Sequence, residues 1–236
     1  MIVSAEYRLL PESSGSDMMD DISDFWDWIR NDLQYQISKL KSGIEVDLLK
    51  IAVQGGSAGG TLAIQSGFYQ PAGFIKAVIA TYPGLATGAK REKPIMGAPT
   101  IPPAVLEEYL KNMKPESIVT SADPPAPMQI ALSLAQQQRT IEFYGLDDKL
   151  YPMKVLEKIK DAPYMLVLHG KDDTAVMVKG SIDFAEAVGR KLGDNKIDLI
   201  IQPGEHGFDA AIALDTPWLK EGLEKATKLW LGSAGS

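Results

Sequence analysis

Short apolar runs alternate with segments of helical period along most of this 236-residue chain. Four of these runs have the length of strands and lie at residues 51–54, 77–82, 164–168 and 197–202. A further short strand is expected at residues 1–7. Strands that alternate with helices are typical of a parallel sheet whose crossover helices cover its faces. The sequence therefore predicts an α/β fold with a mostly parallel sheet and flanking helices.

Helices are predicted where apolar residues recur three or four positions apart, because this spacing places them on one face of a helix. The first such face comprises Trp26, Ile29, Leu33, Ile37 and Leu40. Gly43 is expected to end this helix, since glycine readily adopts the left-handed conformation that follows many helices. Two more helices are expected at residues 59–69 and 178–192. The last helix begins with Thr216 as its N-cap and Pro217 at its first position.

A long segment, residues 84–162, interrupts this alternation. It is rich in proline and methionine, and helices are expected within it at residues 105–113, 128–138 and 153–160. Long insertions of this kind often serve as lids, although ordinary helical packing is an equal alternative. We therefore expect residues 1–236 to form a single domain with a helical insertion or lid.

Composition excludes several classes of function. A net charge of −7 without a basic stripe argues against a nucleic-acid partner. The absence of cysteine excludes disulfides, thiolate metal sites and a cysteine nucleophile. No apolar run is long enough to span a bilayer, so stable membrane insertion is not expected. The first residues lack the features of a signal peptide, so a cytoplasmic location is expected. No metal site is expected, because Asp20, Asp21, Asp147 and Asp148 have no ligand spacing and are expected to be solvated.

A glycine-rich turn, Gly-Gly-Ser-Ala-Gly at residues 55–59, fits the pattern G-x-S-x-G. It follows a predicted strand and opens a predicted helix. In that context the pattern forms a tight turn that exposes the serine hydroxyl above the sheet, and its glycines allow close approach of the backbone. A phosphate-binding turn is the alternative, but neither G-x-G-x-x-G nor a Walker lysine is present. Ser57 is therefore the candidate nucleophile.

Two later segments supply a candidate acid and a candidate base. A serine hydroxyl needs a base that titrates near the working pH, and His206 follows the last predicted strand. Asp172 and Asp173 follow the preceding strand, and one of them can orient the histidine. Ser57, Asp173 and His206 satisfy the order serine, acid, histidine that accompanies this kind of turn. His169 precedes both aspartates, so a structural role is expected for it.

Four segments stand out when they are read together. They are Tyr7-Arg8-Leu9-Leu10-Pro11-Glu12, Gly55-Gly56-Ser57-Ala58-Gly59-Gly60, His169-Gly170-Lys171-Asp172-Asp173 and Gly204-Glu205-His206-Gly207-Phe208. In this order they resemble the hormone-sensitive-lipase-like branch of the α/β-hydrolases. Together they span most of the chain and are far more specific than any one of them. The resemblance implies a carboxylesterase or lipase-like serine hydrolase that acts on a small-molecule acyl ester.

The resemblance also implies roles for individual residues. Carried over position by position, Ser57 is the nucleophile and His206 is the base. Asp173 is the acid, because the motif H-G-x-x-D places it there. The backbone N–H of Ala58 is implied as one donor of the oxyanion hole. Neither a cofactor nor a metal is implied.

Two departures from the family pattern affect these expectations. The residue before the serine is usually acidic in this branch, and here it is Gly56. The family also places a His-Gly-Gly loop and further strands ahead of the Tyr-Arg-Leu strand, whereas this sequence begins inside that strand. Each lost oxyanion donor costs about 3 kcal/mol of transition-state stabilisation. The sequence therefore predicts an N-terminally truncated hydrolase with weak or no turnover, whose unpaired strand edges allow self-association.

Three hypotheses for function follow. The first is hydrolysis of carboxylic esters through an acyl-enzyme on Ser57. The second is a catalytically impaired hydrolase-fold protein that binds a small apolar ligand under residues 84–162. The third keeps the same residues and cleaves an amide or peptide bond, which nothing in the sequence separates from the first. An apolar acyl pocket is suggested by Met96, Met113, Met128, Leu134, Phe143 and Tyr144.

Overall fold

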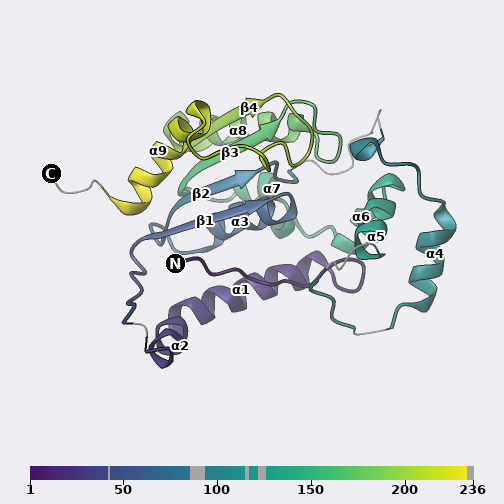
Figure 1. Ribbon diagram of the computed structural model, residues 1–236, viewed down its shortest axis with the longest axis horizontal. Coiled ribbons are helices and arrows are strands. Elements are labelled where there is room, and N and C mark those ends of the chain that lie inside the picture. Colours follow the sequence, from purple (N-terminus) through teal and green to yellow (C-terminus); the bar gives the residue numbers. More distant parts are fainter. Residues whose placement is uncertain (42, 86–93, 115–116, 122–125, 233–236) are drawn as a thin grey trace. The chain divides into compact units, whose positions relative to one another are not determined.

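The computed structural model describes residues 1–41, 43–85, 94–114, 117–121 and 126–232 (Figure 1). The chain forms two compact units. The first comprises Met1–Val46 and Glu92–Leu150, and the second comprises Asp47–Arg91 and Tyr151–Ser236. The second unit contains the sheet, whereas the described part of the first unit is built from helices and connecting segments.

A four-stranded parallel sheet, with its strands in chain order, forms the centre of the second unit (Figure 1). The strands are β1 (Ile51–Gly56), β2 (Ile75–Thr81), β3 (Tyr164–Gly170) and β4 (Ile197–Gln202). These strands match the four apolar runs, so the predicted α/β fold with a parallel sheet is confirmed. The register pairs Thr81 with both Gly56 and Leu168, and Gly170 with Gln202. The carboxyl ends of the strands therefore lie along one edge of the sheet.

Helices cover both faces of this sheet. They are α3 (Ala58–Tyr69), α8 (Val178–Leu192) and α9 (Pro217–Leu231). The short α7 (Pro152–Leu156) packs against α3 and α8. Leu219 and Ala226 of α9 pack in one cluster with Leu166 of β3. His169, three positions along the same strand, points to the other face and bonds to Ser181 of α8, as the alternation of side chains along a strand requires. The result is a layer of helix on each face of the sheet.

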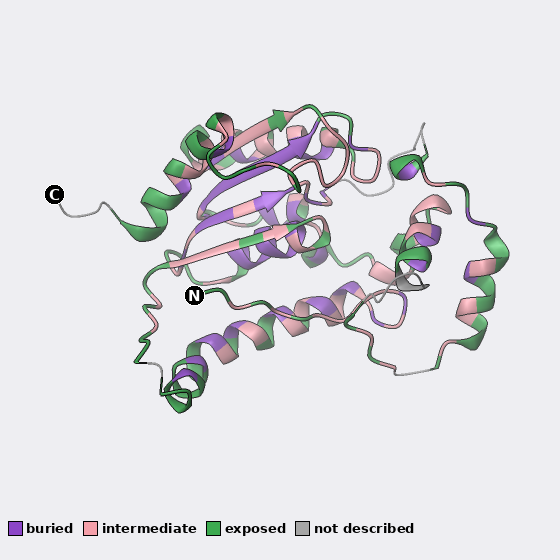
Figure 2. Cartoon of the chain, in the orientation of Figure 1, coloured by how far each residue is buried: buried purple, intermediate pink, exposed green. Residues whose placement is uncertain are grey.

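The strand β3 forms the centre of the core, and all seven of its residues are buried (Figure 2). Met165, Leu166 and Val167 have no exposed area. Burial of every position, rather than of alternate ones, is expected for an inner strand of a parallel sheet with helices on both faces. This explains why residues 164–168 read as a continuous apolar run rather than as an alternating one.

Most predicted elements of this unit are present with nearly the same bounds, and α8 and β4 match their predicted bounds. The last helix begins at Pro217 with Thr216 as its N-cap residue, although the Thr216 side chain makes no capping hydrogen bond. The helix predicted at residues 153–160 is wrong in length, because α7 ends at Leu156. Beyond Leu156 the next two residues are exposed, so no apolar face remains to hold a longer helix against the core.

Five α-helices are described in the first unit. They are α1 (Gly15–Asn31), α2 (Leu33–Lys39), α4 (Pro103–Asn112), α5 (Ala126–Gln136) and α6 (Thr140–Tyr144). Helices α4 and α5 correspond to the predictions at residues 105–113 and 128–138, and Leu106, Ile130 and Leu134 form a small core between them. Helix α6 was not predicted, since five residues are too few to show a helical period.

Two short 3₁₀ helices also belong to the first unit, η1 (Ile95–Gly97) and η2 (Asp148–Leu150), and a third, η3 (Asp194–Lys196), belongs to the second. None of them was predicted, because three residues carry no periodic signal. Parts of the predicted insertion, at 86–93, 115–116 and 122–125, lie outside the described residues.

The strand predicted at residues 1–7 is wrong. In the part of the chain that the structure describes, these residues pair with no strand. The segment that follows is instead fixed to α1 by side chains, because the Arg8 guanidinium bonds to Asp17 and Asp21 at 3.2 and 2.9 Å. The backbone N–H of Arg8 also donates to Asp21 at 2.8 Å. Asp21 is therefore not the solvated charge that was predicted.

The single helix predicted around Trp26 is divided in two. Asp32 has a φ of −121° and separates α1 from α2. Ser14 begins α1 with a capping box, in which Ser14 and Asp17 exchange hydrogen bonds, an arrangement that stabilises a helix start. The predicted apolar face is buried except for Leu40, which is 75% exposed just beyond the end of α2.

No helix among the described residues is long and apolar enough to cross a membrane.

Candidate active site

A strained backbone conformation marks the turn between β1 and α3. Ser57 has a φ of 55° and a ψ of −120°. Residues other than glycine rarely adopt this backbone conformation, which costs on the order of 1–3 kcal/mol. The N–H of Ser57 donates to the carbonyl of Thr81 on the neighbouring strand at 2.9 Å. The carbonyl of Ser57 accepts from the N–H of Thr61 in α3 at 3.2 Å. The sheet and the helix together therefore hold the serine in this conformation.

The glycines of this turn have unequal roles. A Cβ on Gly55 would lie 2.2 Å from the carbonyl oxygen of Gly59, a backbone atom that cannot rotate away. A Cβ on Gly60 would lie 3.2 Å from the carbonyl oxygens of Gly55 and Thr81. At Gly59 a Cβ would meet nothing within 4 Å. The close passage of strand and helix thus requires glycine at position 55, whereas the space around position 59 does not.

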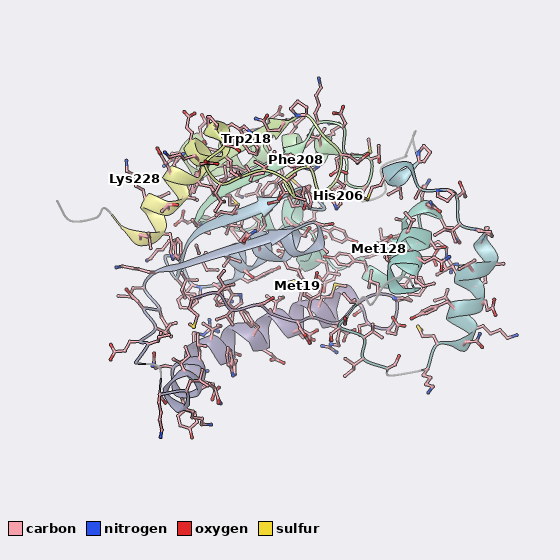
Figure 3. All side chains as sticks on the ribbon, in the orientation of Figure 1. Met19, Met128, His206, Phe208, Trp218 and Lys228 are labelled. Carbon is pink, nitrogen blue, oxygen red and sulfur yellow. The ribbon has the colours of Figure 1, made fainter. Side chains whose placement is uncertain are left out.

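The three residues predicted from the sequence come together at the carboxyl edge of the sheet. Ser57 follows β1, Asp173 follows β3, and His206 follows β4. Figure 3 labels His206 on the loop after β4. The Nε2 atom of His206 lies 3.1 Å from the Oγ of Ser57. Its Nδ1 atom lies 2.8 Å from Oδ2 of Asp173. Serine, histidine and aspartate therefore form one continuous chain of hydrogen bonds.

Asp173 is held as a carboxylate. Its side chain has no exposed area, and its Oδ1 accepts from the N–H groups of Ala175 and Val176 at 2.9 and 2.7 Å. Burial alone would raise the pKa of Asp173, but hydrogen bonds from His169, His206 and the backbone of Val176 outweigh it and hold the pKa below its usual range. A carboxylate only accepts, so the Nδ1 atom of His206 carries the proton and Nε2 is free to accept from the serine hydroxyl.

His169 occupies the structural position that was predicted. It is fully buried, its Nδ1 lies 2.8 Å from the Oγ of Ser181, and its Nε2 lies 2.9 Å from the carbonyl of Val176. Nε2 also makes a longer contact of 3.4 Å with Asp173. Both ring nitrogens are thus engaged in joining β3 to α8 and to the loop that carries Asp173. Asp172, by contrast, is exposed.

Tyr82 packs against His206, and the sequence analysis did not identify this tyrosine as part of the site. The ring of Tyr82 lies 4.3 Å from the imidazole of His206, centroid to centroid. The ring centroid of Phe208 lies 6.2 Å from that of Tyr82 and 6.2 Å from that of Trp218. Burial is the main cause that raises the pKa of Tyr82 to about 12, and the nearby carboxylate of Asp209 adds to it. The hydroxyl therefore stays neutral. Tyr82 directly follows β2, and the rule that ligands meet the carboxyl ends of parallel strands could have identified it.

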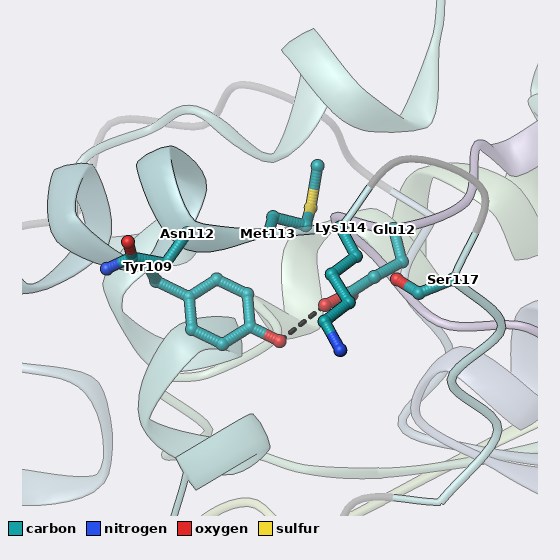
Figure 4. Close-up of a pocket in the computed structure, with 6 residues that line it drawn as sticks. All are labelled: Glu12, Tyr109, Asn112, Met113, Lys114 and Ser117. Carbon is teal, nitrogen blue, oxygen red and sulfur yellow. Dashed lines mark hydrogen bonds between the residues drawn. The ribbon is translucent and has the colours of Figure 1, made fainter.

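A separate cavity of about 240 Å³ lies in the first unit (Figure 4). Its lining consists of Glu12, Tyr109, Asn112, Met113, Lys114 and Ser117. The hydroxyl of Tyr109 donates to Glu12 within this lining. None of Ser57, Asp173 and His206 contributes to it. Within the described ranges, no group of three or more histidine, aspartate or glutamate side chains is arranged to hold a metal ion.

Comparison with known proteins identifies the family. A family model described as alpha/beta hydrolase fold matches residues 1–174. "Probable carboxylesterase M8" of Phoma sp. is 29% identical over 241 residues, which cover 98% of this chain and 75% of that protein. "Probable carboxylesterase clz11" of Cochliobolus lunatus is 30% identical over 187 residues, which cover 75% of this chain and 85% of that protein.

Solved structures show the same fold. Thermogutta terrifontis esterase 2 phosphonylated by sarin matches with a TM-score of 0.56 and 20% identity, over 94% of this chain and 68% of that chain. The chain therefore belongs to the α/β-hydrolase fold family, and the resemblance to its hormone-sensitive-lipase-like branch is confirmed. Membership of this family also confirms the prediction that the chain is a hydrolase.

The glycines of the turn provide a matched pair of variants. Gly55→Ala is expected to destabilise the protein by about 1–3 kcal/mol, because the new Cβ would overlap a backbone oxygen. Gly59→Ala is expected to change stability by less than about 1 kcal/mol, since its Cβ enters open space in a helix. Urea unfolding measures both. Equal effects of the two substitutions would contradict the described packing of β1 against α3.

The ionised Asp173 predicts a pH dependence of stability. Its folded pKa lies below the unfolded value of about 3.9, so its contribution is fully present above that value and is lost as the pH falls through the folded pKa. Asp173→Asn has no carboxylate that could be protonated in this way. The difference in unfolding free energy between wild type and Asp173→Asn should therefore shrink as the pH falls below about 4. A difference that grows below that pH would contradict this assignment.

Proposed function

We propose that this chain is a serine hydrolase that cleaves carboxylic esters through an acyl-enzyme intermediate on Ser57. The observation that carries the proposal is the position of His206, whose two ring nitrogens lie 3.1 Å from the Oγ of Ser57 and 2.8 Å from Asp173. The choice of an ester bond is supported by the two similar proteins that are named as carboxylesterases. The substrate class is a small-molecule acyl ester.

The first half of the reaction transfers the acyl group to the enzyme. The Oγ of Ser57 attacks the ester carbonyl carbon while Nε2 of His206 takes the hydroxyl proton. A tetrahedral oxyanion forms and collapses, and the bond between the carbonyl carbon and the alkoxy oxygen breaks. His206 gives its proton to that oxygen, so an alcohol leaves and the acyl group remains on Ser57.

The second half returns the enzyme to its starting state. A water molecule gives a proton to Nε2 of His206 as its oxygen attacks the acyl carbon. The second tetrahedral intermediate collapses with release of the carboxylic acid, and the proton returns to the Oγ of Ser57. One ester and one water are consumed, and one acid and one alcohol are produced. No redox partner or cofactor is required by this balance.

Asp173 acts through the tautomer and the charge of the histidine. Because its Oδ2 accepts from Nδ1, the imidazole presents a lone pair on Nε2 to the serine. When His206 takes the serine proton it becomes a cation, and the buried carboxylate stabilises that charge at 2.8 Å. The two backbone N–H groups on its other oxygen fix the direction of the carboxylate.

The oxyanion would be stabilised at the start of α3. Ala58 is the first residue of this 12-residue helix, so its N–H has no partner within the helix. It directly follows the nucleophile, and the positive end of the helix dipole lies at the same place. We assign the N–H of Ala58 as one oxyanion donor on this basis.

Covalent labelling tests the nucleophile. We expect a fluorophosphonate probe to label the wild-type chain and p-nitrophenyl esters to be hydrolysed, and both signals to be lost in Ser57→Ala. Asp173→Asn should lower kcat by about 10⁴-fold, because the amide favours the wrong tautomer of the histidine. Ser38→Ala is the matched control, since Ser38 is an exposed serine of α2.

Two outcomes would contradict the proposal. Labelling of folded Ser57→Ala would place the reactive group elsewhere. A folded wild-type chain that binds esters but is neither labelled nor active would favour the alternative of a hydrolase-fold protein that binds a small apolar ligand. A panel of esters and amides then separates ester from amide cleavage.

A further inference from the structure

Glu205 joins the two loops that carry the acid and the base. Its Oε1 accepts from the backbone N–H of Thr174 at 2.5 Å and from the backbone N–H of His206 at 2.9 Å. Its Oε2 accepts from the Oγ1 of Thr174 at 2.6 Å. Three donors from two segments 31 residues apart in the chain thus converge on one carboxylate. Hydrogen bonds to a charged acceptor are roughly twice as strong as those between neutral groups.

The bonded residues are the direct neighbours of the site. Thr174 follows Asp173, and Glu205 precedes His206. A second contact runs beside the first, because the N–H of Asp172 donates to the carbonyl of Gly204 at 3.0 Å. The glutamate therefore ties the loop after β3 to the loop after β4 at positions adjacent to Asp173 and to His206.

The loop around His206 needs such a tie. Gly204 and Gly207 flank it with φ values of 135° and 81°, conformations that glycine adopts freely. The Glu205 side chain is half-buried. Burial alone would raise the pKa of Glu205, but the hydrogen bonds from Thr174 and from the backbone of His206 outweigh it and lower the pKa. The carboxylate is therefore ionised at neutral pH and accepts all three bonds.

We propose that Glu205 is a positioning residue, which sets the distance between His206 and Asp173 by clamping their two loops together through Thr174. This role rests on the proposed esterase mechanism, in which His206 must reach Ser57 and Asp173 at once. A displacement of about 1 Å in such a group can cost on the order of 100-fold in rate. The effect should fall on kcat rather than on KM, because Glu205 acts on the base and not on the bound ester.

Two substitutions separate hydrogen bonding from charge. In Glu205→Gln the amide oxygen can accept from both backbone N–H groups, and the amide nitrogen can donate to the Oγ1 of Thr174. In Glu205→Ala all three bonds are lost. We expect kcat to fall about 10- to 100-fold in Glu205→Ala with KM within about twofold. Glu205→Gln should retain kcat within about threefold of the wild type.

A partner substitution tests the route through Thr174. Thr174→Val keeps the backbone N–H but removes the hydroxyl, so a smaller loss of kcat is expected than in Glu205→Ala. The double variant should be no slower than Glu205→Ala alone, since the shared bond is already absent. Glu224→Ala, an exposed glutamate of α9, is the matched control and should leave kcat unchanged.

The imidazole N–H resonance of His206 provides a readout that does not need turnover. The proton between Nδ1 and Asp173 should give a downfield proton NMR signal, which His206→Ala removes. We expect the signal to persist in Glu205→Gln and to broaden or shift in Glu205→Ala, at unchanged midpoint of unfolding. If no ester is turned over but the signal responds in this way, the esterase proposal fails while the clamp stands.

Several results would overturn the proposal. A Glu205→Ala variant with wild-type kcat and an unchanged signal would show that the clamp does not position the base. A Glu205→Gln variant as slow as Glu205→Ala would show that the charge, and not the hydrogen bonds, matters. A loss of kcat in Glu205→Ala that is matched by unfolding would indicate a structural role alone.

Discussion

The strained backbone at Ser57 is the constraint on which the rest of the site depends. A φ of 55° at a serine persists only where the surroundings leave no alternative. Here the N–H is fixed to Thr81 on β2, the carbonyl is fixed to Thr61 in α3, and Gly55 lies against the carbonyl of Gly59. The turn raises the hydroxyl above the edge of the sheet. Stability contributed by the core is thus used to hold one reactive group in place.

The parallel sheet accounts for the other two groups. Because all four strands run in the same direction and in chain order, the loops that follow β1, β3 and β4 leave the sheet at one edge. Residues separated by up to 149 positions can then share a hydrogen bond. Specific contacts define these loops. Two backbone N–H groups hold Asp173, Tyr82 contacts the ring of His206, and Glu205 joins the two loops.

The sequence predicted the second unit better than the first. The strand β3 is buried at every position, so its apolar run is unmistakable. Ser57, Asp173 and His206 follow strands in the expected order. The first seven residues show the opposite case. Their apolar pattern resembles a strand, but the neighbouring Arg8 is held by Asp17 and Asp21, which a local pattern cannot reveal. The clamp by Glu205 was missed for the same reason, since a contact across 31 residues leaves no periodic signal.

Rapid-quench mass spectrometry tests the central claim most directly. The chain is mixed with an excess of p-nitrophenyl ester, quenched in acid within the first turnovers, digested and mapped. The proposed mechanism predicts an added acyl mass on the peptide that contains Ser57, formed together with a burst of p-nitrophenol. An acyl group on another residue, or ester turnover without any covalent intermediate, would contradict it.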